Sequence, residues 1–235
     1  MALQTDCIKM LVNVIIVAAG KGLRLKSQIP KQFLPLSGKP ILAHTLAIFE
    51  QHPAVEEIVI VGAQDWLFYL SSDIVEKYRF DKVRKIVAGG KERQHSVQAG
   101  LEALENKKRP VLIHDGVRPF VSAVLIDRVL ASLQGADACI PAIASADTIK
   151  EVDGDWVRRT LPRASLRRVQ TPQVFHTETL LDALSAANRN GDFVTDEATL
   201  IEKKGGKVRW VEGEIQNMKI TTDFDLKVAH LILGE

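Results

Sequence analysis

Residues 12–36 read VNVIIVAAGKGLRLKSQIPKQFLPL, and this stretch decides what kind of fold the chain can adopt. Residues 14–19 form a continuous apolar run, as expected for a strand buried on both faces of a parallel sheet. The run leads directly into Gly20-Lys21-Gly22 and then into scattered basic residues. A buried strand that ends in a glycine loop indicates a ligand site at the carboxyl edge of an α/β sheet.

Two well-known glycine loops are excluded by spacing. A dinucleotide-binding loop needs a third glycine at position 25, which is Leu25. A P-loop needs its second glycine at that same position, and Lys26-Ser27 is also misplaced for it. Two interpretations remain: a nest of backbone N–H groups that binds an anion, helped by Arg24 and Lys31, or a tight turn with solvated charges.

The rest of the chain alternates short apolar strands with helical patterns. Strands are predicted at 12–18, 57–61, 83–88, 110–114, 136–143 and 207–212. Helices are predicted at 40–51, 64–78, 93–106, 122–133, 178–190, 196–204 and 222–233. This alternation predicts an α/β fold: a mostly parallel, twisted, Rossmann-like sheet with helices on both faces. We expect one domain at 12–235, preceded by a flexible extension at 1–11.

Residues 145–175 do not continue the alternation of strands and helices, and they predict a protruding arm. A Val-Asp-Gly-Asp-Trp turn signal at 152–156 indicates a hairpin, and arginines are concentrated around it. A two-stranded ribbon is marginal alone in water, so we expect the arm to be covered by a second copy of the chain. The arm therefore predicts a homodimer.

Bulk composition narrows the class of function. Lys and Arg total 31 against 29 Asp and Glu, for a net charge of +2 over 235 residues, which argues against a general nucleic-acid or membrane binder. The sequence has 2 cysteines and no apolar run of the length of a membrane span, and its first ten residues do not resemble a signal peptide. We expect a cytoplasmic protein.

Two further predicted strand ends carry polar groups that point to the anion-binding interpretation of the first loop. IVAGGKERQHSV (86–97) places Gly89-Gly90 after a strand, and IHDGVRPF (113–120) follows another strand. The side chains that these loops offer are Arg93, Ser96, Asp115 and Arg118. Because the carboxyl ends of parallel strands share one edge of the sheet, one ligand can span these loops.

These residues carry a family resemblance that extends from Val12 to the C-terminus. AAGKGLRL with PKQF, AGGKERQHSV, HDGVRPF, TPQVF, TDEA and NMKITT, in that order, resemble the 2-C-methyl-D-erythritol 4-phosphate cytidylyltransferase family of the non-mevalonate isoprenoid pathway. The resemblance implies attack by a sugar-alcohol phosphate on the α-phosphorus of CTP, with Mg²⁺, releasing pyrophosphate. Such a reaction needs positioned cations rather than a general base, since the nucleophile is already an anion.

The resemblance also implies residue roles. Residues expected to neutralise phosphate charge are Arg24 and Lys31 at the α-phosphate and pyrophosphate, and Arg163 and Lys219 at the acceptor phosphate. Residues expected to bind the nucleotide are Ala18, Ala19 and Gly20 through their backbone, and Gly90 and Ser96 at the cytosine, with Arg93 helping to shape that loop. Asp115 and Arg118 are expected near the ribose and the acceptor, and Thr171 and Thr195 as minor contacts. Asp115 is also the one candidate to reach the metal, whose main ligands are expected to be triphosphate oxygens and water.

Three alternatives frame this interpretation. A ribitol-5-phosphate cytidylyltransferase would share the CTP half of the site, but the Thr-Asp-Glu-Ala segment at 195–198 favours methylerythritol phosphate as the acceptor. A CTP-binding module without turnover would not require the phosphate-facing cations. For Arg163, one interpretation is a solvated charge on the arm. The other is a site residue, and in that case we expect Arg163 to complete the acceptor site of the partner subunit.

Overall fold

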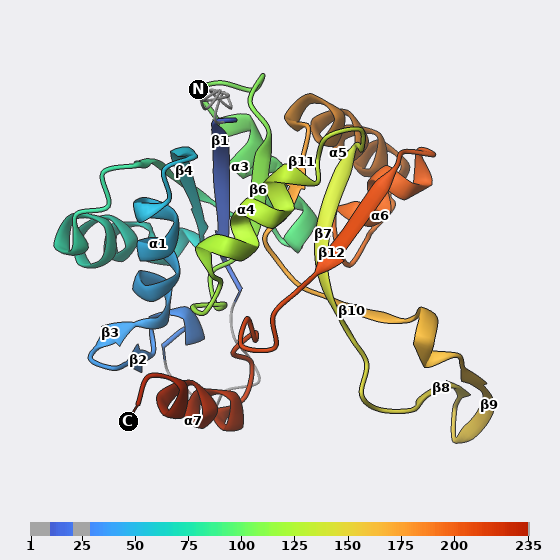
Figure 1. The fold of residues 1–235 in the computed structure, drawn as a ribbon. Helices are drawn as coiled ribbons and strands as arrows, with labels where there is room; N and C mark the ends of the chain where they lie inside the picture. Colours follow the sequence, from blue (N-terminus) through green and yellow to red (C-terminus); the bar gives the residue numbers. More distant parts are fainter. Residues whose placement is uncertain (1–9, 21–28, 235) are drawn as a thin grey trace, which may run out of the picture.

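The computed structural model describes residues 10–20 and 29–234. Strands of its central sheet are β1 Val12–Ala18, β4 Val55–Gly62, β5 Val83–Ala88, β6 Val111–Asp115, β7 Ala138–Ala144, β10 Arg167–Val169, β11 Gln173–Phe175 and β12 Val208–Glu212. The described residues build an 8-stranded sheet in the order β10-β7-β11-β6-β1-β4-β5, with β12 paired to β7 (Figure 1). Strands β1, β4, β5 and β6 are parallel, as are β7 and β12, which confirms the predicted mostly parallel sheet.

Helices cover both faces of the sheet, because β1 alternates its side chains between two cores. The helices are α1 Ile41–Gln51, α3 Arg93–Ala103, α4 Ala123–Ala131, α5 Thr177–Asn190, α6 Ala198–Lys203 and α7 Asp223–Ile232. Val14 and Ile16 are fully buried in one core with side chains of α1 and α4. Ile15 is fully buried in the other core with side chains of α3, α5 and α6. This period of two is what a strand buried on both faces requires.

The predicted helix starts lie within two residues of the observed ones, that of α3 at Arg93 agrees, and two starts are fixed by capping side chains. Ser122 accepts a hydrogen bond from the backbone N–H of Leu125 at the start of α4. Thr222 and Asp225 form a capping box at the start of α7. The helix predicted at 64–78 is a succession of shorter helical pieces: η2 Gln64–Trp66, α2 Leu67–Tyr69 and the π-helical η3 Leu70–Glu76.

The predicted arm is present but shorter than residues 145–175. Strands β8 Ile149–Asp153 and β9 Trp156–Leu161 form a separate two-stranded ribbon, which turns at Gly154 with a positive φ of 55° (Figure 1). Residues beyond it return to the body, where β10 pairs with β7 and β11 lies between β6 and β7, all antiparallel. The sequence prediction missed β10 and β11 because each contributes only three residues to the sheet.

Two further expectations concern the N-terminal extension and membrane-spanning helices. Most of the extension predicted at 1–11 lies outside the described residues. Within the described ranges, no helix has both the length and the apolar character needed to cross a membrane.

Candidate active site

The glycine loops meet in one cavity at the carboxyl edge of the sheet. This cavity, called the nucleotide cavity below, has a volume of about 190 Å³. Predicted site residues that line it are Ala18, Ala19, Gly20, Lys31, Gly90, Arg93, Ser96, Asp115 and Lys219. They come from the ends of β1, β5 and β6, from η1 Lys31–Phe33, from the start of α3 and from the segment before α7, so residues far apart in the chain are brought together. Arg24 lies outside the described residues.

Close packing of the loops explains the glycine at position 89. A Cβ atom built there would lie 2.5 Å from the Cβ of Ala19 and 2.7 Å from Oγ of Ser96, both far inside van der Waals contact. The backbone N–H of Gly90 donates to Oγ of Ser96 at 3.2 Å, which closes the loop around the start of α3. The sequence motif therefore reflects a steric requirement at the junction of the two loops.

Gln32 is a functional residue that sequence reasoning missed, although it lies within the quoted PKQF motif. Its side chain is buried, and its Nε2 donates to the backbone carbonyl of Ala18 at 2.6 Å. The end of β1 is thereby tied to the short η1 helix Lys31–Phe33, which carries Lys31. An otherwise unexplained polar residue between Lys31 and Phe33 was the available signal.

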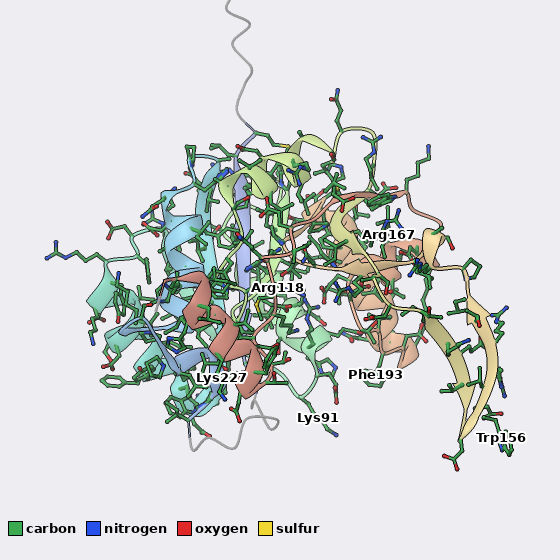
Figure 2. All side chains as sticks on the ribbon, turned by 60° about the horizontal axis from the view of Figure 1, so that its bottom comes forward. Lys91, Arg118, Trp156, Arg167, Phe193 and Lys227 are labelled. Carbon is green, nitrogen blue, oxygen red and sulfur yellow. The ribbon has the colours of Figure 1, made fainter. Side chains whose placement is uncertain are left out.

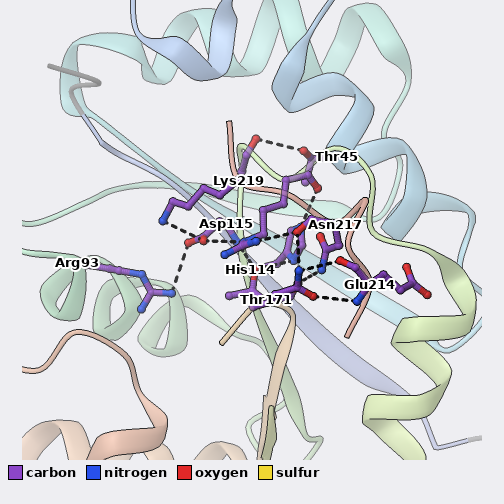
Figure 3. A network of polar contacts seen from close by, with 11 residues as sticks. Thr45, Arg93, His114, Asp115, Thr171, Glu214, Asn217 and Lys219 are labelled. Carbon is purple, nitrogen blue, oxygen red and sulfur yellow. Dashed lines mark hydrogen bonds and ion pairs between the residues drawn. The ribbon is translucent and has the colours of Figure 1, made fainter. Parts of the chain in front are cut away.

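Asp115 is the centre of the site's charges (Figure 3). Its Oδ2 lies 3.0 Å from Nζ of Lys219 and 3.2 Å from Nε of Arg118, and its Oδ1 lies 3.6 Å from a terminal nitrogen of Arg93. Burial raises the pKa of Asp115, but Lys219, Arg93 and Arg118 outweigh burial and hold this pKa well below its usual range. The carboxylate is therefore ionised, and it orders three cations at the edge of the sheet.

His114 is a structural imidazole rather than a base. It is fully buried, and burial lowers its pKa to about 3, so the ring is neutral. Nε2 lies 3.2 Å from the carbonyl oxygen of Arg118, which can only accept, so this nitrogen carries the proton. Nδ1 then accepts from the Thr171 hydroxyl at 3.0 Å.

Thr171 has a more internal role than the predicted substrate contact. Its Oγ accepts from the backbone N–H of Asp115 at 3.1 Å while its hydroxyl proton points to His114. The hydroxyl thus connects the end of β6 to the segment before β11. Both of its strong hydrogen bonds are made within the protein, so Thr171 positions Asp115.

A second cavity, also of about 190 Å³, adjoins the first and is called the acceptor cavity below. Predicted residues that line it are Arg93, Asp115, Arg118, Thr171, Thr195 and Lys219. Arg93, Asp115 and Lys219 line both cavities, so these charged side chains form the wall between them. The sequence did not predict this division into two compartments.

Two buried residues that were not predicted hold the Lys219 segment in place. Asn217 is fully buried; its Nδ2 donates to the carbonyl of Thr171 at 2.8 Å, and its own carbonyl accepts from Arg118 at 2.8 Å. Gln170 donates to the carbonyl of Glu214 at 2.8 Å and accepts from the backbone N–H of Glu214 at 3.1 Å. Lys219 is therefore carried by a rigidly bonded segment.

Arg163 is not brought to either cavity of its own chain. It lies in η4 Arg163–Ser165, at the end of the arm that joins β10, and its guanidinium donates to the carbonyl of Ala146 at 2.9 Å. Trp156 lies at the far tip of the same arm, away from Arg118 in the body (Figure 2). Within one chain, the predicted set is therefore complete except for Arg163 and the undescribed Arg24.

Comparison with known proteins gives one consistent result. Residues 12–235 match the family model described as 2-C-methyl-D-erythritol 4-phosphate cytidylyltransferase. A protein of that name from Clostridium kluyveri (strain NBRC 12016) is 45% identical over 219 residues, covering 93% of this chain and 94% of its own. Another from Geotalea uraniireducens (strain Rf4) is 42% identical over 226 residues, covering 95% and 97%.

Solved structures agree with the sequence comparison. The 4-diphosphocytidyl-2C-methyl-D-erythritol synthase of Anaerococcus prevotii DSM 20548 superposes with a TM-score of 0.84 at 33% identity, covering 97% of this chain and 98% of that one. The shared fold, the ordered motifs and the cation-lined cavities are all consistent with membership of the same family. The chain belongs to the 2-C-methyl-D-erythritol 4-phosphate cytidylyltransferase family.

Proposed function

We propose that this chain joins CTP and 2-C-methyl-D-erythritol 4-phosphate, giving CDP-methylerythritol and pyrophosphate, with CTP in the nucleotide cavity and the acceptor in the acceptor cavity. One observation carries the division of roles: Asp115 and two of its cations, Arg93 and Lys219, form the wall that the two cavities share. Two polyanions that react with each other need cations at their meeting point. The family and its named relatives support the substrates.

The chemistry follows from this arrangement. An oxygen of the acceptor phosphate attacks the α-phosphorus of CTP, and the bond from that phosphorus to the pyrophosphate oxygen breaks. Lys31 stabilises charge on the nucleotide side, and Lys219 draws the acceptor phosphate toward the wall. No proton has to be removed from the nucleophile, which fits the neutral and internally bonded His114. Rate enhancement comes from alignment and charge stabilisation.

A divalent cation, Mg²⁺, fits this site as a companion of the triphosphate. Within residues 10–20 and 29–234, no group of three His, Cys, Asp or Glu side chains is placed to hold a metal. Mg²⁺ commonly takes one or two carboxylates and completes its shell with substrate phosphates and water, and the ionised Asp115 can supply one such carboxylate. When bound, the metal would neutralise phosphate charge.

The arm supports a homodimer in which Arg163 completes the acceptor site of the partner subunit. Trp156 is 81% exposed and Val152 and Val157 are each 60% exposed, a cost that burial against a second chain would remove. Arg163 is exposed and lines neither cavity of its own chain. Two-fold symmetry would make the exchange reciprocal.

A cytoplasmic location is part of the same proposal. The chain has only 2 cysteines, too few for a disulfide framework. Cys139 is a buried free thiol, and burial raises its pKa to about 11, so it is unreactive.

Pyrophosphate release tests the function directly. The purified protein is supplied with CTP, Mg²⁺ and either methylerythritol 4-phosphate or ribitol 5-phosphate, and the nucleotide product is identified by mass. We expect turnover with methylerythritol phosphate. Equal or higher kcat/KM with ribitol phosphate would assign the acceptor differently, and binding of CTP without turnover would indicate a nucleotide-binding module.

A further inference from the structure

Glu197 is a buried carboxylate that neither the motif roles nor the proposed reaction uses. It is 1% exposed and lies at the N-cap position of the short helix α6, where its side chain makes no capping hydrogen bond. One carboxylate oxygen, Oε1, accepts a hydrogen bond from Arg93 NH1. The other oxygen, Oε2, is buried without a hydrogen-bond partner among the described residues. Burying a carboxylate costs free energy unless its charge is well paired, so the pairing of Glu197 with Arg93 has to offset this cost.

Arg93 is held from two sides. Glu197 contacts NH1, while Asp115 lies 3.6 Å from NH2, a looser ion pair (Figure 3 shows the Asp115 side). Burial lowers the pKa of Arg93, but the charge of Glu197, followed by that of Asp115, outweighs burial and raises this pKa. Burial also raises the pKa of Glu197, and the charge of Arg93 opposes this rise, so each group favours the charged form of the other.

The place where Arg93 is held matters, because it lines both the nucleotide cavity and the acceptor cavity. Asp115 already has Lys219 at 3.0 Å and Arg118 at 3.2 Å. A guanidinium free to swing would compete with Lys219 for the carboxylate and leave the wall between the cavities. Glu197, on the α6 side of Arg93, would oppose this movement.

We propose that Glu197 is a positioning residue for the transfer reaction: it holds the Arg93 guanidinium in the wall between the two cavities, so that this charge faces the reacting phosphates. The inference rests on the proposed function of the site. Neither substrate has to contact Glu197, since it acts through Arg93. Its effect should appear in the chemical step, because misplacing a charge weakens transition-state stabilisation more than ground-state binding.

Glu197→Gln is the main test, since it keeps the shape and removes the charge. The matched control is Glu202→Gln, the same change at an exposed position of α6. We expect Glu197→Gln to lower kcat at least tenfold while KM for CTP stays within about threefold and the circular dichroism spectrum is unchanged. The control is expected to keep wild-type kcat. A wild-type kcat in folded Glu197→Gln, or a change confined to KM, would overturn the proposal.

A double-mutant cycle separates positioning from a general effect on the fold. If Glu197 acts through Arg93, adding Glu197→Gln to Arg93→Ala causes no further loss of kcat. It should also raise the melting temperature of Arg93→Ala, because that variant leaves a buried carboxylate unpaired. Additive losses of kcat would refute positioning. If the wild type shows no turnover, the proposed function fails, and the melting temperatures still test the pair.

Discussion

Asp115 illustrates how single residues make this site. Its carboxylate is buried, which by itself favours the neutral form, yet three cations keep it ionised. The net result is a compact cluster with more positive than negative charge, placed where two phosphate-bearing substrates would meet. The side chain that looks like a metal ligand in the sequence is first of all an anchor for cations in the structure.

Lys31 is the first residue to test. Lys31→Ala is expected to lower kcat by about 10²–10³, roughly 3–4 kcal/mol, with a smaller change in KM for CTP, because its charge is needed most as pyrophosphate departs. Steady-state kinetics of pyrophosphate release measures both constants, and Arg24→Ala is expected to behave alike. Lys39→Ala, at an exposed lysine of the same segment, is the control. Near-wild-type kcat in both variants would remove these cations from the mechanism.

His114 predicts a pH dependence of stability. Its pKa is lowered from 6.5 to about 3 in the folded protein, so between these values the unfolded chain binds more protons. The free energy of unfolding should therefore fall as the pH falls from 6.5 toward 3. In His114→Gln this slope should become smaller.

Urea unfolding at several pH values between 4 and about 7 gives the slope. The control is His176→Gln, the same substitution at an exposed histidine. Identical slopes in wild type and His114→Gln would mean that His114 is protonated in the folded state or accessible to solvent.

At the level of elements, the loop between β5 and α3 is the part of the nucleotide cavity most suited to choosing a base. It packs so closely on the β1 loop that position 89 admits no side chain. Ser96, at the start of α3, is buried and already accepts from Gly90. Because this loop is fixed by close packing, the hydrogen-bonding groups that it presents to a base are preorganised and do not adapt to different bases.

This loop predicts a preference for CTP over UTP, ATP and GTP. We expect the space beside Gly90 to be too small for a purine. Uracil presents a carbonyl where cytosine has its amino donor, which would leave two acceptors facing each other. The measurement is kcat/KM for each nucleotide with the same acceptor. Comparable values for CTP and UTP would contradict the role of this loop, and Ser96→Ala should raise KM for CTP.

On the scale of the whole molecule, the arm of β8 and β9 protrudes from the body (Figure 1). Its apolar side chains Val152, Trp156 and Val157 are exposed. In a monomer, these apolar side chains would remain exposed to water. An exchange of arms would bury them and deliver Arg163 to the second site. Lys219, held by the Asn217 segment, would act within its own chain.

Mixing two inactive variants tests this arrangement. Arg163→Ala and Lys219→Ala, each nearly inactive alone, should regain activity when co-assembled. One site of the heterodimer would lose both groups and the other would keep both, so about half of the wild-type activity per dimer is the upper limit. Differently tagged subunits and tandem purification isolate the heterodimer. An isolated heterodimer without recovery, or a fully active monomer, would place Arg163 in its own chain's site or outside the mechanism.

The sequence by itself determined the sheet, the ligand edge and the family. Buried strands with period-two packing and helices with periodic apolar faces are local patterns, and glycines at strand ends mark the edge where a ligand binds. Gly20, Gly90, Ser96 and Asp115 could be chosen from such patterns together with the family motifs. Their positions in the cavity lining agree with that choice.

Only the tertiary structure decided which polar and charged side chains of the site pair with each other. Glu197 and Arg93 are 104 residues apart in the chain, and Thr171 and His114 are 57 apart, so no local pattern could pair them. The antiparallel β11 inserts between β6 and β7 and brings Thr171 to Asp115, so that Thr171, expected as a substrate contact, also accepts from the backbone of Asp115. Hydrogen bonds and ion pairs depend on distances in space, and these are fixed only when distant segments pack against each other.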